Sequence, residues 1–193
     1  LYWAPARWQF PAGVVVAPGA VVTVHVAAAG EATESAFFTG VSGARVLSRT
    51  DAVGLYRSSL FGDPEEILDF VQWGGAGQSG EEVAVSAGIW GERETVEVDA
   101  LRGGASIAYD GSGDSALDWC VDGSATIGAP NDTCTTSFAS TQIRLSEIGF
   151  ARPLDGPAHF AIELEHRGDV LEDISGRLLA LDGTAFQVTC QET

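Results

Sequence analysis

Short apolar runs separated by turn-forming residues are the feature that most constrains how this chain can fold. Runs rich in Val, Ile, Phe, Tyr and Thr recur between Gly, Pro and Asp residues, a pattern typical of an all-β sandwich. The expected strands span residues 14–16, 21–27, 44–48, 53–56, 68–73, 95–98, 106–109, 142–150, 159–165, 177–181 and 185–189. The sequence therefore predicts an all-β fold.

Alternation between apolar and acidic residues is clearest near the C-terminus. Phe160, Ile162 and Leu164 fall on one face of an extended segment. Glu163 and Glu165 fall on the other face, as a half-buried strand requires. We interpret the acidic face as the solvent face of a sandwich.

Helix is expected to be scarce. Asp63 followed by Pro64 gives an N-cap and a first helical residue, but the β-branched and aromatic residues that follow limit this helix to one turn. Residues 79–85 are a second short candidate, with Ser79 and Glu82 spaced as a capping box. At most one or two short helical turns are predicted.

The charge of the chain excludes several classes of partner. It has 27 acidic residues against 10 basic ones, and its formal net charge is -17. Such a field repels phosphates and anionic lipids, so no nucleic-acid partner is expected. No stretch approaches the roughly 20 apolar residues of a membrane span, so membrane insertion is not expected either.

The cysteines suggest an oxidising compartment. Cys120 and Cys134 lie in a stretch rich in Gly, Ser, Thr, Asp and Pro, where a disulfide between them would add about 3 kcal/mol in the chain-entropy model. This predicts a secreted protein found outside the cell or at its surface. Cys190 is left over, either as a free thiol or as a link between molecules.

The chain divides into a main part and an appendage that needs a partner. Residues 1–140 are expected to form the main body of the sandwich, because residues 135–141 read as a linker. Residues 141–193 carry too few strands to bury a core alone. We expect them to complete the same sandwich or that of a neighbouring subunit, and both alternatives stay open.

Two blocks of short motifs resemble parts of the bacterial lamin-tail-like domain. The first block contains Trp8-Gln9-Phe10-Pro11-Ala12-Gly13, the Pro18-Gly19 turn, and residues 53–56, 67–74 and 106–111; the second contains residues 143–148, 160–165 and 173–179. The second block stands first in the family, so the chain is similar to a member with its halves permuted. The resemblance implies an immunoglobulin-like β-sandwich and a non-catalytic module.

An incomplete sandwich favours self-assembly. It exposes unpaired sheet edges and an apolar groove, and a donated strand satisfies both. We predict a structural subunit that forms an extracellular fibre or surface layer with copies of itself as partners. The contact residues would be Tyr2, Trp3, Trp8, Phe10, Ile143, Leu145, Ile148, Phe160, Ile162 and Leu164. The alternative is a monomeric adhesion or carbohydrate-binding module with surface polysaccharide as its partner, and the aromatic N-terminal arm could equally pack on its own sandwich.

No catalytic residue and no cofactor are predicted. Glu147, Glu163 and Glu165 could supply the paired carboxylates of a glycoside hydrolase, which is the third functional hypothesis. His25, His159 and His166 are expected at surface or edge positions.

One metal site and one modification site are weakly indicated. Asp110, Asp114 and Asp118 resemble the start of a calcium loop, but the Gly and Glu that complete such a loop are missing. Asn131, the only Asn in the chain, begins an N-glycosylation pattern, which we interpret as accidental. No metal is predicted.

Overall fold

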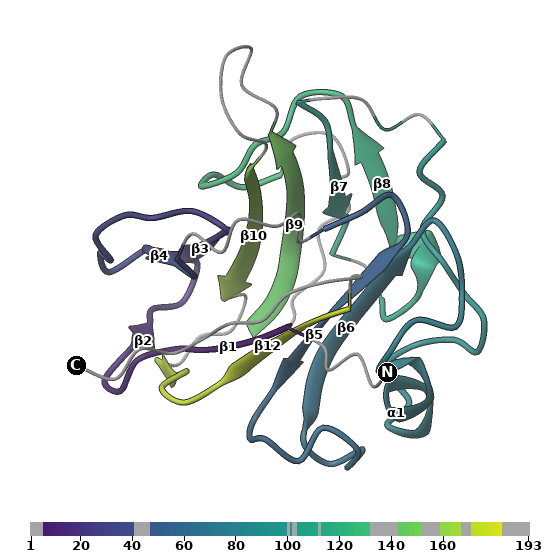
Figure 1. The fold of residues 1–193 in the computed structure, drawn as a ribbon, viewed down its shortest axis with the longest axis horizontal. Helices are drawn as coiled ribbons and strands as arrows, with labels where there is room; N and C mark the ends of the chain where they lie inside the picture. Colours follow the sequence, from purple (N-terminus) through teal and green to yellow (C-terminus); the bar gives the residue numbers. More distant parts are fainter. Residues whose placement is uncertain are drawn as a thin grey trace.

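The computed structural model describes residues 6–40, 47–99, 101, 104–111, 113–131, 143–151, 159–166 and 171–182. Two main β-sheets lie face to face around a shared apolar core (Figure 1). Within these described residues, helix is confined to α1 (Glu81–Ser86) and the short 3₁₀ helix η1 (Ala116–Asp118). The prediction of an all-β sandwich with at most two short helical turns is confirmed.

The first sheet has four antiparallel strands. Its order is β1 (Ala6–Gln9), β12 (Leu178–Asp182), β5 (Asp51–Tyr56) and β6 (Ile67–Trp73). β12 aligns with β1 on one side and with β5 on the other. A strand from the end of the chain therefore joins the first strand to the rest of its sheet.

The second sheet has six strands. Its order is β4 (Ala36–Phe38), β3 (Val21–Val26), β10 (His159–His166), β9 (Ile143–Ala151), β7 (Ser106–Tyr109) and β8 (Trp119–Asp122). All neighbours are antiparallel except β3 and β4. A two-stranded ribbon of β2 (Val15–Val16) and β11 (Glu172–Asp173) completes the architecture.

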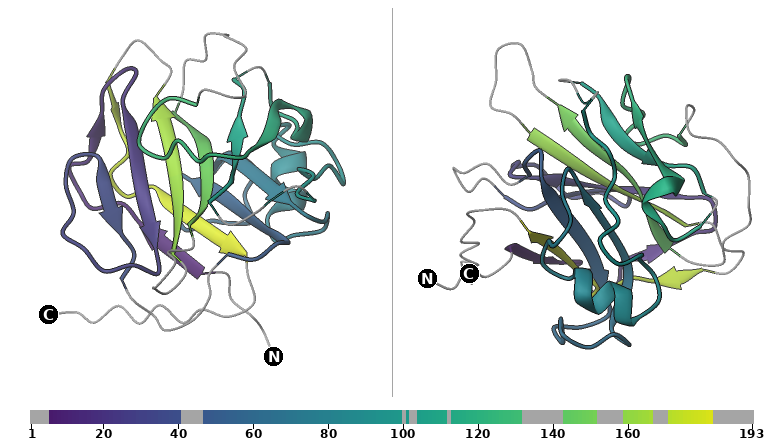
Figure 2. Two further views of the ribbon diagram at one scale, coloured as in Figure 1. Left: turned by 90° about the horizontal axis from the view of Figure 1, so that it is seen from above. Right: turned by 90° about the vertical axis from the view of Figure 1, so that its right-hand side faces the viewer.

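The C-terminal strands occupy interior positions in both sheets, as the two views of Figure 2 also show. β10 and β9 lie between β3 and β7, and β12 lies between β1 and β5. Without residues 143–182, which we call the completing segment, the six-stranded sheet would separate into two strand pairs. The part of the chain before it, residues 6–131, is called the body below.

Several strands escaped the sequence analysis or end differently. β1, β4, β8 and β11 were not among the expected strands, because they have two to four residues and lack a strong alternation. The expected strand 95–98 contributes one isolated bridge from Val96 to Trp73. The expected strand 185–189 and residues 44–46 of another lie outside the described residues.

The short helix predicted over residues 79–85 is present as α1, but its predicted cap needs correction. Residues 63–66 form a turn in which the Asp63 carboxylate accepts a hydrogen bond from the Glu65 amide at 3.0 Å. α1 starts after Gly80, which has a φ of 92°, and no side chain caps it. The capping box at Ser79 is therefore wrong, since a left-handed glycine takes the cap position.

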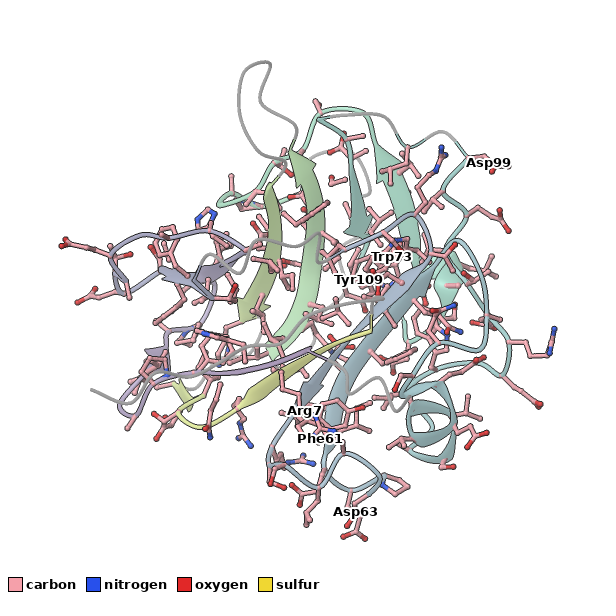
Figure 3. All side chains as sticks on the ribbon, viewed as in Figure 1. Arg7, Phe61, Asp63, Trp73, Asp99 and Tyr109 are labelled. Carbon is pink, nitrogen blue, oxygen red and sulfur yellow. The ribbon has the colours of Figure 1, made fainter. Side chains whose placement is uncertain are left out.

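The aromatic arm packs on its own sandwich. Trp8 and Phe10 lie 4.6 Å apart between ring centroids, and Phe37 of β4 contacts both rings. Arg7 lies 3.7 Å above the ring of Phe61, which Figure 3 labels. Of the two arm alternatives, the described part of the arm follows the intramolecular one; Tyr2 and Trp3 lie outside the described residues.

Candidate strand-acceptor site

The predicted assembly residues that the structure describes lie in the core of their own chain or pack against it. Ile143, Leu145, Ile148, Phe160, Ile162 and Leu164 are all buried, as is Phe10, while Trp8 is half-buried. The alternation predicted for β10 holds, since its apolar residues face the other sheet. The surface of the body that receives the completing segment is the best-defined candidate site, and polar contacts fix where that segment sits.

The first polar contact joins the two sheets. Asp69 of β6 is 6% exposed, and its Oδ2 accepts a 2.6 Å hydrogen bond from the Leu145 amide of β9. Its Oδ1 accepts a 2.9 Å bond from the amide of Phe70. Arg144 lies 3.6 Å from Asp69 and 2.5 Å from Asp114. A buried carboxylate of the body therefore specifies which residue of β9 stands beside it.

Burial raises the pKa of Asp69 to about 6, although Arg144 and two backbone amides favour its ionised form. Removing a carboxylate from water costs more than these partners return. At neutral pH the Asp69 carboxyl is ionised and balances the positive charge of Arg144. The negative charge of Asp69 in turn helps to raise the pKa of Arg144.

A second set of contacts comes from residues 126–131, which we call the clasp. The clasp follows β8 and lies over the outer face of β9 and β10, where Ile127 approaches Gly149 so closely that a Cβ there would lie 2.8 Å from Ile127 Cγ1. The Thr126 amide donates to Glu147 at 2.9 Å, and the Gly128 amide donates to Glu163 at 2.6 Å. The clasp therefore binds one carboxylate on each of the two completing strands.

Glu147 and Glu163 are aligned directly across β9 and β10. They are 0% and 1% exposed, so their interpretation as solvent-facing acids is wrong. Glu163 Oε1 accepts a 2.6 Å hydrogen bond from Ser146 Oγ, and Glu147 accepts a 3.2 Å bond from Thr126 Oγ1. The outer face of this sheet is a second, polar interior, which the clasp creates by covering it.

Burial also raises the pKa of both glutamates. The pKa of Glu163 is raised to about 7, since burial and the charges of Glu147 and Glu165 outweigh its two hydrogen bonds. The pKa of Glu147 is raised by burial and by Asp122, against hydrogen bonds from Ser106 and Thr126. The Ser106 hydroxyl has no partner of good geometry among the described residues, so we regard its contact with Glu147 as weak.

Asn131, the last residue of the clasp, binds two backbone carbonyls of the six-stranded sheet. Its Nδ2 donates to the carbonyl of Tyr109 at 3.0 Å and to that of Ser146 at 2.9 Å. Ser146 has no aligned residue on β10, because the register shifts there by one residue and forms a β-bulge. The Asn131 side chain thus binds the carbonyl of the bulged residue. The nitrogen that a glycan would use is thus hydrogen-bonded in the folded chain.

The weak calcium candidate is not assembled. Asp114 is bonded to Arg144, and Asp118 caps η1 through the Ser115 amide at 2.8 Å and the Ser115 hydroxyl. Asp110 is half-buried. Over the part of the chain that the structure describes, no group of three His, Cys, Asp or Glu residues could hold a metal ion.

The geometry offers little room for a small ligand beside Asp69. A small cavity there has walls from Trp90, Tyr109, Trp119 and Arg144, with space for no more than about one water molecule. His25 is half-buried on β3, whereas His166 is 1% exposed. The surface or edge position predicted for His166 is therefore wrong, and nothing is described of the His159 side chain.

Cys120 lies on β8 and is bonded in a disulfide. Cys134 and Cys190 lie outside the described residues, so the predicted pairing with Cys134 stays a prediction. Of the described helices, neither α1 nor η1 has the length and apolar character needed to cross a bilayer.

Comparisons with protein-family models, curated proteins and solved structures find no match to this chain. The signal that sequence reasoning missed is the clasp, because nothing in the local pattern of residues 126–131 indicates that they cover two glutamates.

Proposed function

We propose that this protein is a non-catalytic extracellular structural module whose sandwich is completed by its own C-terminal strands. The observation that carries the proposal is the interior position of β9, β10 and β12 between strands of the body. Secretion, the Cys120 to Cys134 disulfide and the resemblance to lamin-tail-like domains belong to this proposal. As an adhesion module, the protein would contact surface polysaccharide.

Completion within one chain is favoured by chain connectivity. A tether holds the completing segment beside its own acceptor at an effective concentration of the order of millimolar for a short flexible linker. A neighbouring molecule has to match that concentration before it competes. The glutamates also support a structural role, because their carboxylates bind the clasp and are covered by it.

The proposal is tested by the size of the purified chain. We expect one species with the mass of a single chain in size-exclusion chromatography with light scattering, at all dilutions. Large species that resist dilution would overturn completion within one chain and support strand donation instead.

The second candidate is a fibre or surface layer built by strand exchange. The specific observation in its favour is that the completing segment is contiguous and follows the body in sequence. If a chain gives this segment to the next copy, every contact described above is kept. Such head-to-tail contacts propagate when they do not close on themselves.

Exchange can be tested with a matched pair of steric variants. Gly149→Val places a side chain of the completing segment against Ile127, and we expect it to destabilise the closed chain by about 1–3 kcal/mol, as overpacking does. Ile127→Ala opens the matching space in the body. When the two variants are refolded together, exchange would pair the enlarged strand with the enlarged acceptor.

A species that contains both chains in equal amounts would show that exchange takes place. Recovery of separate monomers from the mixture would exclude it under these conditions. The double variant Gly149→Val with Ile127→Ala is the control, because it relieves the clash within one chain and needs no exchange.

A further inference from the structure

Besides one hydrogen bond from Asn131 to the Ser146 carbonyl, the clasp holds the completing strands through ionisable side chains and not through strand pairing. Its hydrogen bonds to the side chains of β9 and β10 all end on Glu147 or Glu163. Those two carboxyl groups face each other across aligned strands and are buried by the clasp that they bind. The strength of the clasp must therefore depend on how many protons the pair carries.

The neighbours of the pair are acidic or neutral. Glu165 follows on β10, and Asp122 of β8 adds a further negative charge beside Glu147. From the clasp itself, Thr126 and Gly128 contribute neutral groups. The described groups that raise or lower the two pKa values thus include no cation, and ionisation of both glutamates places like charges side by side.

On the opposite flank, β3 presents Thr23 directly beside Glu163. His25 stands two aligned pairs further along, and its ring stacks on Phe38 at 4.7 Å between centroids. It is the one described histidine on this flank, and it is half-buried.

We propose that the clasp is a proton-operated latch, closed over β9 and β10 while Glu163 carries a proton and released when that proton passes to solvent. The hydrogen bonds around Glu163 explain how the protonated state is accommodated. A protonated carboxyl can donate to Ser146 Oγ and still accept from the Gly128 amide, because a hydroxyl serves as donor or acceptor. In the closed state both oxygens of Glu163 then keep their hydrogen-bond partners, and Glu163 carries no charge.

Loss of the proton changes this balance. The carboxylate keeps both hydrogen bonds, but it is then a buried negative charge beside Glu147 with no described cation to oppose it. Release of the clasp returns both groups to water, where the ionised forms are stable. Since the pKa of Glu163 is about 7 in the closed state against 4.5 for the free side chain, closure weakens as the pH rises from 4.5 through 7.

The size of the effect follows from these two values. Each pH unit between them shifts the equilibrium between the closed and released clasp up to tenfold, so the full window corresponds to at most about 300-fold. Glu147 acts in the same direction, because its pKa is raised as well.

Hydrogen exchange of the Gly128 and Thr126 amides tests the latch directly. After correction for the intrinsic pH dependence of exchange, we expect their protection to fall between about pH 5 and about pH 8, approaching the 300-fold limit. Amides at the centre of β5 report the fold as a whole and should stay better protected than the clasp amides at every pH. Protection that is independent of pH at both clasp amides would overturn the proposal.

Glu163→Gln is the matched variant. Its amide reproduces the protonated carboxyl, donating to Ser146 and accepting from Gly128, but it cannot titrate. We expect protection of the clasp amides in this variant to be high and nearly independent of pH. The same fall as in the unmodified chain would assign the effect to another group and would also overturn the proposal.

Glu165→Gln serves as the neighbouring control. It removes an acidic group from the same strand, two residues away and only half-buried, so most of the pH dependence should persist. If this variant alone abolishes the fall, Glu163 is not the group that operates the latch. The ¹³C shift of the Glu163 carboxyl gives the midpoint independently, even where a variant fails to fold.

A released clasp would free the completing strands for exchange, and this consequence rests on the proposed function. The two are separable by measurement. Exchange data at high dilution report the latch in a single chain, whereas light scattering at the same pH reports association. If protection of the clasp amides depends on pH while light scattering shows a single chain throughout, the latch is supported and the fibre is not.

Discussion

Asp69 and Glu163 are both buried carboxylates that tie the body to the completing segment, but their hydrogen-bond partners differ in kind. Asp69 accepts from two backbone amides and has Arg144 nearby. Glu163 accepts from one amide and one hydroxyl and has two acidic neighbours. An amide can only donate, whereas a hydroxyl can reverse its direction. Asp69 is therefore suited to a permanent charge, and Glu163 to a proton that comes and goes.

The difference shows that burial alone does not decide what a carboxyl group does. Burial raises the pKa of both groups. At Asp69 the nearby cation limits the rise to about 6, and at Glu163 the acidic neighbours add to burial and the value reaches about 7. The first group remains ionised at neutral pH, and the second titrates there.

The largest effect is expected from Asp69→Asn. The asparagine side chain keeps one oxygen acceptor but places its NH₂ group where the second carboxylate oxygen was. One of the backbone N–H groups of Phe70 and Leu145 then loses its acceptor, and Arg144 loses its buried counter-charge. Breaking a buried pair in this way costs about 3–5 kcal/mol, although removal of a carboxylate whose pKa burial raises to about 6 returns part of this loss. Urea unfolding at pH 7.5 measures the loss. Unchanged stability would show that Asp69 does not specify the position of β9.

Glu163→Gln should have the opposite sign. For a carboxyl group with a raised pKa, the folded state binds more protons than the unfolded state between the two pKa values, so stability falls as the pH rises through that window. With values of 4.5 and about 7, the loss in the unmodified chain amounts to at most about 3 kcal/mol. The glutamine variant avoids it.

We therefore expect the Glu163→Gln variant to match the unmodified chain near pH 4.5 and to exceed it in free energy of unfolding at pH 8. Asp69, with a pKa of about 6, is almost fully ionised above about pH 7, so the interval above that pH reports mainly the glutamates. If the Glu163→Gln variant is less stable than the unmodified chain at pH 8, Glu163 and Asp69 do not differ in the sign of their effect on stability.

Asp114→Asn should have the smallest effect. Asp114 contacts Arg144 at 2.5 Å, but its side chain is 41% exposed, and exposed pairs contribute about 0–1 kcal/mol. We expect a loss of about 0.5 kcal/mol or less by urea unfolding. A loss as large as that of Asp69→Asn would mean that Arg144 is positioned from the surface and not by the buried carboxylate.

Local sequence predicted the long strands well. β3, β5, β6, β7, β9 and β10 all lie within two residues of expected strands at one end or both, because apolar alternation and β-branched residues act within a single segment. The short strands β1, β4, β8 and β11 could not be found in this way, since their strand geometry comes from the neighbours with which they pair.

The acceptor site was likewise predicted in part, on its apolar side only. The apolar inward face of β10 was predicted from its period of two, but the outer face was misjudged because Glu163 and Glu165 have the same local pattern and different burial. Their difference arises from the clasp, which is remote in sequence. Local periodicity identifies the two faces of a strand and cannot say what covers either one.

By itself, then, the sequence determined that the chain is all-β, which residues of the C-terminal strands face an apolar core, and that those strands need partners, because hydrophobic period and segment length are local properties. Tertiary structure alone decided where the strands insert, that the clasp covers two glutamates of an acidic face, and that burial raises the pKa of Asp69 and of Glu163. Those outcomes depend on desolvation and on donors supplied from distant parts of the chain, and neither is encoded in any one segment.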